Sequence, residues 1–185
     1  MRRAVFLDRD GTLIEEAGYL DRLDRIRFFP YSVDAVRLLE RAGFAVVVVT
    51  NQSGVARGLF DERFVAAAHD RIAQALASGG AAVDAFYYCP HHPDGSVAAY
   101  RCACDCRKPK PGLLHRAASD LDLVLDRSFV VGDRAADIEA GLTVGAPGVL
   151  VRTGYGCGHE SRARASGAAI VDNLIDAVAW ILRQP

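Results

Sequence analysis

The stretch that decides the fold is Val5-Phe6-Leu7-Asp8-Arg9-Asp10-Gly11-Thr12-Leu13. The apolar run Ala4-Val5-Phe6-Leu7 at its start has the composition of a buried strand, and two aspartates follow at once on a turn closed by Gly11 and Thr12. Ligands of parallel α/β sheets bind just beyond the carboxyl ends of the strands. Two neighbouring carboxylates repel each other, and a divalent cation offsets them most simply. The alternative interpretation is that Asp8 and Asp10 only form a turn and cap a helix.

Further apolar runs alternate with helical patterns along the chain. Ala45–Val49 is a continuous β-branched run, which is typical of a strand buried on both faces of a parallel sheet. The sequence therefore predicts an α/β fold with a doubly wound, Rossmann-like parallel sheet, in one domain over residues 1–185 and without a large cap domain. The other predicted strands are residues 83–88, 129–132 and 148–151, and the predicted helices are residues 32–42, 61–78, 111–121, 138–144 and one from Asp172.

Two features of this pattern carry specific expectations. Ser32 is predicted to cap the first helix through its hydroxyl group. The segment 152–167 is rich in Gly, Ser and Arg, and we expect it to be mobile. The sequence shows no internal repeat and no low-complexity linker.

Composition excludes several classes of protein. The chain has 185 residues, 51% hydrophobic and 24% charged, with a formal net charge of -1. These values are those of an ordinary globular domain, and the near-neutral charge argues against nucleic acid as a partner. Asp8 interrupts the first apolar run, which argues against a signal peptide, and no run is long enough to span a membrane. We therefore expect a cytoplasmic protein.

Polar groups follow the other predicted strands. Thr50-Asn51-Gln52-Ser53-Gly54 can donate several hydrogen bonds to an anion, although a simple Asx or Ser/Thr turn is an alternative. Arg107, Lys108 and Lys110 flank two prolines that stiffen the backbone, so the cations can meet a phosphate; a solvated basic loop is the alternative. Asp133 follows the 129–132 strand as Asp8 follows the first, and Asp137 can cap or orient its neighbours.

Four of the five cysteines cluster within residues 89–106, together with two histidines. Cys89-Pro90-His91-His92-Pro93 and Cys102-Ala103-Cys104-Asp105-Cys106 form two compact groups of ligands separated by a loop, as tetrahedral zinc requires. A closed four-ligand site is structural rather than catalytic. The chemistry of the side chains alone does not decide which of them bind, and free buried thiols are the alternative.

These motifs together resemble the haloacid dehalogenase superfamily of phosphatases. The resemblance rests on Asp8–Thr12, Thr50-Asn51, Lys108 and Gly132-Asp133, in the order of the four superfamily motifs. More narrowly, the cysteine groups and Thr50–Gly54 resemble the heptose bisphosphate phosphatases of the histidinol-phosphatase-like subfamily. Histidinol-phosphate phosphatase domains share the zinc loop, but the long insert between its two halves here favours the heptose enzymes.

The resemblance implies a role for each matched residue. Asp8 would be the nucleophile that forms an aspartyl-phosphate, and Asp10 the general acid and base. Mg²⁺ would be held by the Asp8 side chain, the Asp10 backbone carbonyl and Asp133. Thr50 and Lys108 would hold the transferring phosphoryl group. The residues implied in substrate binding are Glu16, Ala17, Gly18, Tyr19, Asn51, Gln52, Ser53, Arg107 and Arg134, and those implied in Zn²⁺ binding are Cys89, His91, Cys104 and Cys106.

The expected function is removal of the 7-phosphate of a heptose 1,7-bisphosphate by a monomeric enzyme whose only partner is its small sugar phosphate substrate. A second hypothesis is the same chemistry on histidinol phosphate or on a nucleic-acid 3′-phosphate end. A third is a zinc-stabilised binding module that has lost catalysis. The joint presence of Asp8, Asp10, Lys108 and Asp133 counts against the third hypothesis.

Overall fold

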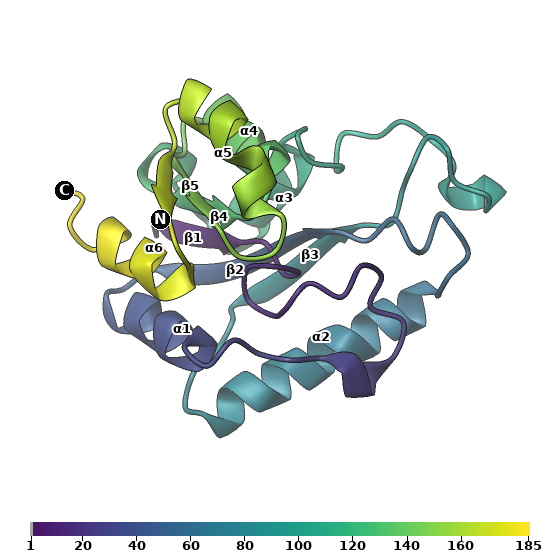
Figure 1. The fold of residues 1–185 in the computed structure, drawn as a ribbon, viewed down its shortest axis with the longest axis horizontal. Coiled ribbons are helices and arrows are strands. Elements are labelled where there is room, and N and C mark those ends of the chain that lie inside the picture. Colours follow the sequence, from purple (N-terminus) through teal and green to yellow (C-terminus); the bar gives the residue numbers. More distant parts are fainter. Residues whose placement is uncertain (1) are drawn as a thin grey trace.

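The computed structural model describes residues 2–185, which form a sheet of six parallel strands between two layers of helices (Figure 1). The strand order is β3-β2-β1-β4-β5-β6, so the chain moves outward from β1 to β3 and then returns to the other side of β1. The strands are β1 (Ala4–Leu7), β2 (Ala45–Asn51), β3 (Ala85–Cys89), β4 (Phe129–Gly132), β5 (Gly148–Val151) and β6 (Ala169–Val171). The predicted doubly wound α/β fold is confirmed.

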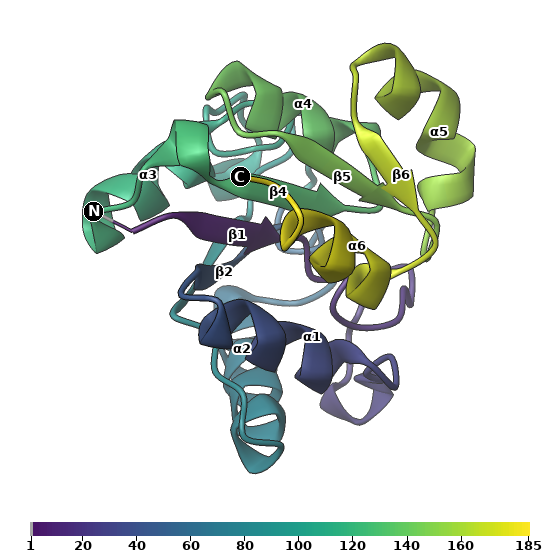
Figure 2. The ribbon, with the colours of Figure 1, turned by 90° about the vertical axis from the view of Figure 1, so that its left-hand side faces the viewer.

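Helices cover both faces of the sheet, as the two perpendicular views show (Figures 1 and 2). One face packs against α1 (Ser32–Arg41), α2 (Glu62–Ser78) and α6 (Leu174–Ile181). The other packs against α3 (Gly112–Leu121), α4 (Ala135–Thr143) and α5 (Gly156–Ala165). Within residues 2–185 there is no separate cap domain over the sheet.

The central strands are apolar on both faces because helices bury both. All four residues of β1 are completely buried, with Val5 and Leu7 packed toward α1 and Ala4 and Phe6 toward α3. A strand with polar residues at every second position would leave buried polar groups unpaired on one face. The continuous apolar runs of the sequence therefore correspond to the innermost strands.

The strand register brings the carboxyl ends of β1, β2 and β4 to one edge. Leu7 pairs with Val48 of β2 on one side and with Val131 of β4 on the other. The backbone N–H of Asp8 continues this ladder by donating to the Val131 carbonyl oxygen at 2.9 Å. The residues that follow these three strands therefore meet at the same edge, as parallel topology requires.

Two of the sequence expectations are wrong. Ser32 does not cap α1 through its side chain: it lies inside the helix, and its hydroxyl donates to the Leu13 carbonyl oxygen at 2.7 Å. The segment 152–167, expected to be mobile, forms α5. Arg152 joins Glu160 at 2.6 Å, and Arg162 joins Glu139 of α4 at 2.5 Å.

The last helix begins slightly later than expected, with Asn173 rather than Asp172 at its cap. The Asn173 side chain accepts a hydrogen bond from the backbone N–H of Asp176 at 3.1 Å. None of the helices formed by residues 2–185 has the length and apolarity that crossing a bilayer requires.

Candidate active site and metal centre

Three carboxylates meet at the edge of the sheet where β1 and β4 end. Asp8 follows β1, Asp133 follows β4, and Asp137 lies in the first turn of α4. One oxygen from each lies within 4.8 Å of the others, and the exposed fractions of the three residues are 7%, 0% and 1%. The predicted meeting of Asp8 and Asp133 is confirmed, and Asp137 joins them.

Lys108 lies between two of these acids. Its Nζ is 2.7 Å from Asp8 Oδ1 and 2.7 Å from Asp137 Oδ1, and it donates to the Val49 carbonyl oxygen at 2.7 Å. The lysine is 5% exposed. The two carboxylates raise the pKa of Lys108 against the opposing effect of its burial, so the ammonium group stays charged.

The acids remain undercompensated. Burial raises the pKa of Asp8 well above its ordinary value, Asp137 and Asp133 raise it further, and Lys108 acts in the opposite direction. Burial also raises the pKa of Asp133 to about 7. Three buried carboxylates face one buried ammonium group. The partly exposed Arg134 guanidinium lies 3.9 Å from Asp133 Oδ1, and this oxygen is buried without a hydrogen-bond partner. A hard divalent cation bound by oxygen ligands fits this donor set.

Backbone from a distant part of the chain holds Asp133 in place. Its Oδ2 accepts a hydrogen bond from the Tyr155 N–H at 2.8 Å. A Cβ on Gly11 would lie 2.3 Å from this oxygen, and a Cβ on Gly154 would lie 2.2 Å from it. Only glycine fits at either position, and both adopt positive φ, +83° and +58°. The segment before α5, which we expected to be mobile, therefore forms part of the site.

Asp10 is not a member of the group that Asp8, Asp133 and Asp137 form. Its carboxylate accepts hydrogen bonds from the buried Arg9 guanidinium, at 3.0 Å from Nε and 3.1 Å from Nη2, and from Gln52 Nε2 at 2.9 Å. This arrangement fixes the carboxyl group of Asp10 at the wall of the pocket described below. The predicted binding of Mg²⁺ by Asp10 involves its backbone carbonyl and stays a prediction.

The polar residues at the end of β2 connect these groups. Thr50 Oγ1 accepts from Gln52 Nε2 at 2.9 Å. Asn51 holds the backbone of Lys108: its Nδ2 donates to the Lys108 carbonyl oxygen and its Oδ1 accepts from the Lys108 N–H, both at 3.1 Å. Asn51 thus fixes the backbone of Lys108, and all four residues from Thr50 to Ser53 line the pocket rather than forming only a local turn.

A pocket with a volume of about 400 Å³ opens above Asp8. Of the residues predicted to be catalytic or substrate-binding, all but Ala17 line it: Asp8, Asp10, Glu16, Gly18, Tyr19, Thr50, Asn51, Gln52, Ser53, Arg107, Lys108 and Arg134. The Ala17 carbonyl oxygen instead accepts from Arg25 at 3.1 Å, and Asp133 is completely buried. Sequence reasoning missed Arg57, Tyr155, His159 and Arg162, because they follow no strand directly and lie in no motif.

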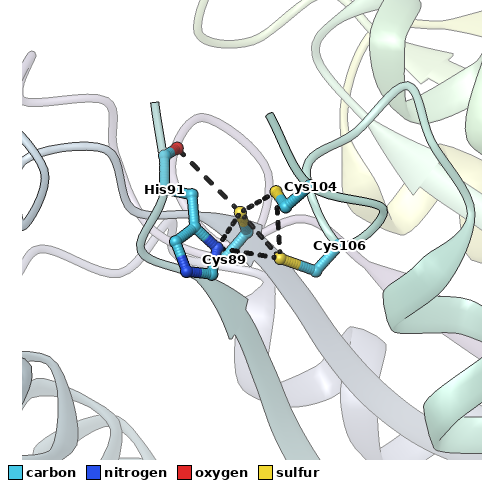
Figure 3. A group of neighbouring side chains, drawn as sticks. All are labelled: Cys89, His91, Cys104 and Cys106. Atoms are coloured by element: carbon cyan, nitrogen blue, oxygen red, sulfur yellow. Dashed lines mark hydrogen bonds between the residues drawn. The ribbon is translucent and has the colours of Figure 1, made fainter. Parts of the chain in front are cut away.

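The cysteine and histidine groups converge on the loops after β3. One ligand atom each from Cys89, His91, Cys104 and Cys106 lies within 4.8 Å of the others (Figure 3). Cys106 Sγ is 3.0 Å from Cys89 Sγ, 3.3 Å from Cys104 Sγ and 3.3 Å from His91 Nδ1. Cys102 is exposed and lies outside this group. Three thiols and one imidazole around one point suit tetrahedral Zn²⁺.

This zinc loop, residues 89–106, is attached to the rest of the site. The Gln52 N–H donates to the Cys89 carbonyl oxygen at 2.8 Å, and Arg107 Nη1 donates to the His91 carbonyl oxygen at 3.4 Å. Tyr88 and Tyr100 both donate to Glu62 at the start of α2. The loop therefore positions the segment that carries Arg107 and Lys108.

Comparison with known proteins agrees with this geometry. A family model described as HAD-hydrolase-like matches residues 105–177. The fold and the site define a phosphatase of the haloacid dehalogenase type, a phosphoric monoester hydrolase.

More particularly, the chain belongs to the family of the D-glycero-beta-D-manno-heptose-1,7-bisphosphate 7-phosphatases. It is 42% identical to the member from Yersinia pestis over 94% of this chain and 92% of that protein. It is 46% identical to the member from Escherichia coli K12 over 82% of this chain and 80% of that protein. The structure is similar to that of the D,D-heptose 1,7-bisphosphate phosphatase from B. bronchiseptica complexed with magnesium and phosphate, with a TM-score of 0.87, 34% identity and 99% of each chain covered.

Proposed function

We propose that this phosphatase removes the 7-phosphate of D-glycero-D-manno-heptose 1,7-bisphosphate through an aspartyl-phosphate on Asp8. The observation that carries the proposal is the Asp8–Lys108 pair beneath the pocket, 2.7 Å apart and flanked by two further buried carboxylates. The names of the relatives support the choice of substrate.

In the first half of the proposed reaction, an Asp8 carboxylate oxygen attacks phosphorus in line with the leaving sugar oxygen. Asp10 donates its proton to that oxygen, so the sugar leaves as an alcohol. Lys108 and the Thr50 hydroxyl hold the oxygens of the transferring phosphoryl group. Asn51 supports this step because its side-chain amide binds both the N–H and the carbonyl oxygen of Lys108 and so fixes the backbone of the lysine.

In the second half, Asp10 takes a proton from water, and the water oxygen attacks the phosphorus of the aspartyl-phosphate. The P–O bond to Asp8 breaks, and inorganic phosphate leaves. Arg9 and Gln52 hold the Asp10 carboxylate between the two proton transfers. The leaving sugar oxygen and the attacking water oxygen occupy the same position opposite Asp8 at phosphorus. One fixed orientation of the Asp10 carboxyl group therefore serves both proton transfers.

The proposal includes two metal ions, Mg²⁺ in the active site and Zn²⁺ in the zinc loop. Asp8 and Asp133, with the backbone carbonyl of Asp10, would hold Mg²⁺, which offsets the charge that develops on the phosphoryl oxygens when it is bound. Cys89, His91, Cys104 and Cys106 would hold structural Zn²⁺. Asp133 Oδ1, which is buried without a hydrogen-bond partner, supports the first site, and the convergence of three thiols on one imidazole supports the second.

We propose further that residues 1–185 act as one monomeric domain in the cytoplasm, with the sugar phosphate as the only partner. The near-neutral charge supports the exclusion of nucleic acid. Static light scattering at micromolar concentration tests the monomer, and a mass of twice 19.9 kDa would contradict it.

The test of the function is phosphate release from a panel of substrates. We expect turnover of heptose 1,7-bisphosphate that depends on added Mg²⁺, weaker turnover of histidinol phosphate, and none by Asp8→Asn. Both anomers of the bisphosphate belong in the panel. Preferred turnover of histidinol phosphate would favour the second hypothesis, and turnover by a folded Asp8→Asn protein would refute the role of the nucleophile.

A further inference from the structure

The Arg134 guanidinium lies over an aromatic ring at the wall of the pocket. Its central carbon is 4.1 Å from the centroid of the Tyr155 ring, which is within the range of a cation–π contact. Two carboxylates lie farther away than a hydrogen bond: Nη2 is 3.6 Å from Glu16 Oε2, and Nε is 3.9 Å from Asp133 Oδ1. Arg134, Tyr155 and Glu16 all line the pocket above Asp8.

The contact with the ring leaves the donors of Arg134 available. It is an attraction between the positive charge and the π face of the ring, so no N–H group has to point at an acceptor. The planar set of donors can still bind the oxygens of a phosphate group or a sugar. Arg162 shows the opposite case in the same pocket, because two of its nitrogens donate to Glu139, at 2.5 Å and 2.9 Å.

The backbone that carries the ring is fixed where α5 begins. The Tyr155 N–H donates to Asp133 Oδ2 at 2.8 Å, and the next N–H, that of Gly156, donates to the Thr153 carbonyl oxygen at 3.0 Å. A Cβ on Gly156 would lie 1.8 Å from the Val151 carbonyl oxygen, so this turn packs closely against the end of β5. The ring therefore extends from a defined position beside the three-acid group.

Arg134 needs such support because its side chain is long and 47% exposed. An arginine that moves freely in solvent loses conformational entropy when it binds a ligand. An arginine that is already held in place loses less, and the ligand binds more tightly for that reason. Support from a ring is suitable here, since a carboxylate at hydrogen-bond distance would occupy the donors that the ligand requires.

We propose that Tyr155 is a positioning residue for substrate binding: its ring holds the Arg134 guanidinium in place for the sugar phosphate. The inference rests on the proposed function, in which Arg134 binds the substrate, and extends it to a residue that lies in no motif. Because the ring orders Arg134 before the substrate arrives, Tyr155 acts on KM rather than on kcat.

A double-mutant cycle tests the coupling between the ring and the guanidinium. With heptose 1,7-bisphosphate as substrate, Tyr155→Leu should lower kcat/KM about two- to fivefold, mainly through KM, which is the range of an exposed cation–π contact. Arg134→Met should lower it more, because the donors themselves are lost. In the Arg134→Met background, Tyr155→Leu should have no further effect. Tyr155→Phe is the matched variant that keeps a ring, and it should retain most of the wild-type kcat/KM.

The Mg²⁺ requirement separates the ring of Tyr155 from its backbone. The hydrogen bond to Asp133 comes from the Tyr155 N–H, which Tyr155→Leu retains. We therefore expect the wild type and Tyr155→Leu to reach half-maximal activity at the same Mg²⁺ concentration. A raised Mg²⁺ requirement in Tyr155→Leu would overturn the inference, because the substitution would then act through Asp133.

Two further outcomes of the cycle would overturn the inference. One is an equal loss from Tyr155→Leu with and without the Arg134 guanidinium, and the other is a folded Tyr155→Phe protein as impaired as Tyr155→Leu. Failure of the proposed function gives a different result, in which the wild-type protein prefers another substrate of the panel. The same cycle measured with that preferred compound still tests the coupling of Tyr155 with Arg134.

Discussion

Lys108 Nζ lies 2.7 Å from Asp8 Oδ1, although 100 residues separate the two in the chain. The lysine also contacts Asp137 at 2.7 Å, so one buried ammonium group offsets two buried carboxylates. Electrostatic interactions are strong here because little water reaches the site. The pair is therefore part of the folded core as well as of the proposed chemistry.

Replacement of Lys108 by methionine should destabilise the protein. The variant leaves Asp8 and Asp137 without their cation, which costs roughly 3–5 kcal/mol when one partner of a buried ion pair is removed. Urea denaturation in the presence of EDTA measures this cost. Lys110→Met is the matched control, because Lys110 is exposed and pairs with the exposed Asp105 at 3.3 Å. Equal effects of the two substitutions would contradict the account.

Gly154→Ala should impair the use of Mg²⁺. The added Cβ would lie 2.2 Å from Asp133 Oδ2, so the carboxylate must move away from its place in the three-acid group. We expect the Mg²⁺ concentration for half-maximal activity to rise about tenfold or more, because a displaced ligand binds the ion less well. Gly145→Ala separates this effect from backbone strain: Gly145 also has positive φ, +77°, but its nearest neighbour atom would be 3.5 Å away. A similar Mg²⁺ dependence of both variants would argue against the role of Asp133.

Cys106→Ser should remove zinc and lower the melting temperature. Cys106 Sγ is the centre of the group, within 3.3 Å of Cys89, Cys104 and His91 ligand atoms. Metal analysis of the purified protein should find about one zinc per chain in the wild type and much less in the variant, since three ligands hold zinc poorly. Cys102→Ser should keep both zinc and melting temperature, because Cys102 is exposed and outside the group. Loss of zinc in Cys102→Ser instead would show that the ligand set is different.

His69 should make stability depend on pH. Its ring is buried, stacks on Phe86 at 4.7 Å, and leaves Nε2 without a hydrogen-bond partner. Burial lowers the pKa of His69 from 6.5 to about 3. Between these values the unfolded chain takes up a proton that the folded protein does not, so stability falls as pH falls below about 6.5 and is retained above it.

The contribution of His69 can be isolated by substitution. Between pH 7 and pH 5, wild-type protein should lose about 2 kcal/mol more of its unfolding free energy than His69→Phe loses. Chemical denaturation at the two pH values gives this difference. His115→Phe is the control, because His115 is exposed and should leave the wild-type pH dependence in place. An identical pH dependence of wild type and His69→Phe would mean that His69 titrates normally in the folded protein.

The sequence was sufficient to predict those parts of the fold and of the site where the local residue pattern and the sheet topology agree. The span predicted for the first strand is the observed β1, because a run that is buried on both faces carries its own signal. Asp8 and Asp133 could be placed together because the carboxyl ends of parallel strands share an edge. The clustering of Cys and His residues in the sequence was enough to predict a metal-binding group, and the structure adds that Cys102 lies outside it.

The sequence was not sufficient to predict those parts of the structure that depend on contacts between residues far apart in the chain. Residues 156–165 have no apolar face, so nothing in their periodicity indicates the helix α5; contacts of Arg152 with Glu160 and of Arg162 with Glu139 hold it in place. The contact of Lys108 with Asp137 depends on how the loop that carries Lys108 meets the first turn of α4. Arg57 Nη2 and His92 Nε2 lie 3.3 Å apart although they come from different loops, and their spacing in sequence carries no signal.

The central claim is that Asp8 attacks phosphorus. It is tested most directly by mixing the protein with Mg²⁺ and heptose 1,7-bisphosphate labelled at the 7-phosphate, quenching with acid within one turnover, and mapping the labelled peptide by mass spectrometry. The account predicts a transient phosphoryl group on Asp8 that decays at the rate of phosphate release. Rapid phosphate release without labelled protein, or with the label on another residue, would contradict it.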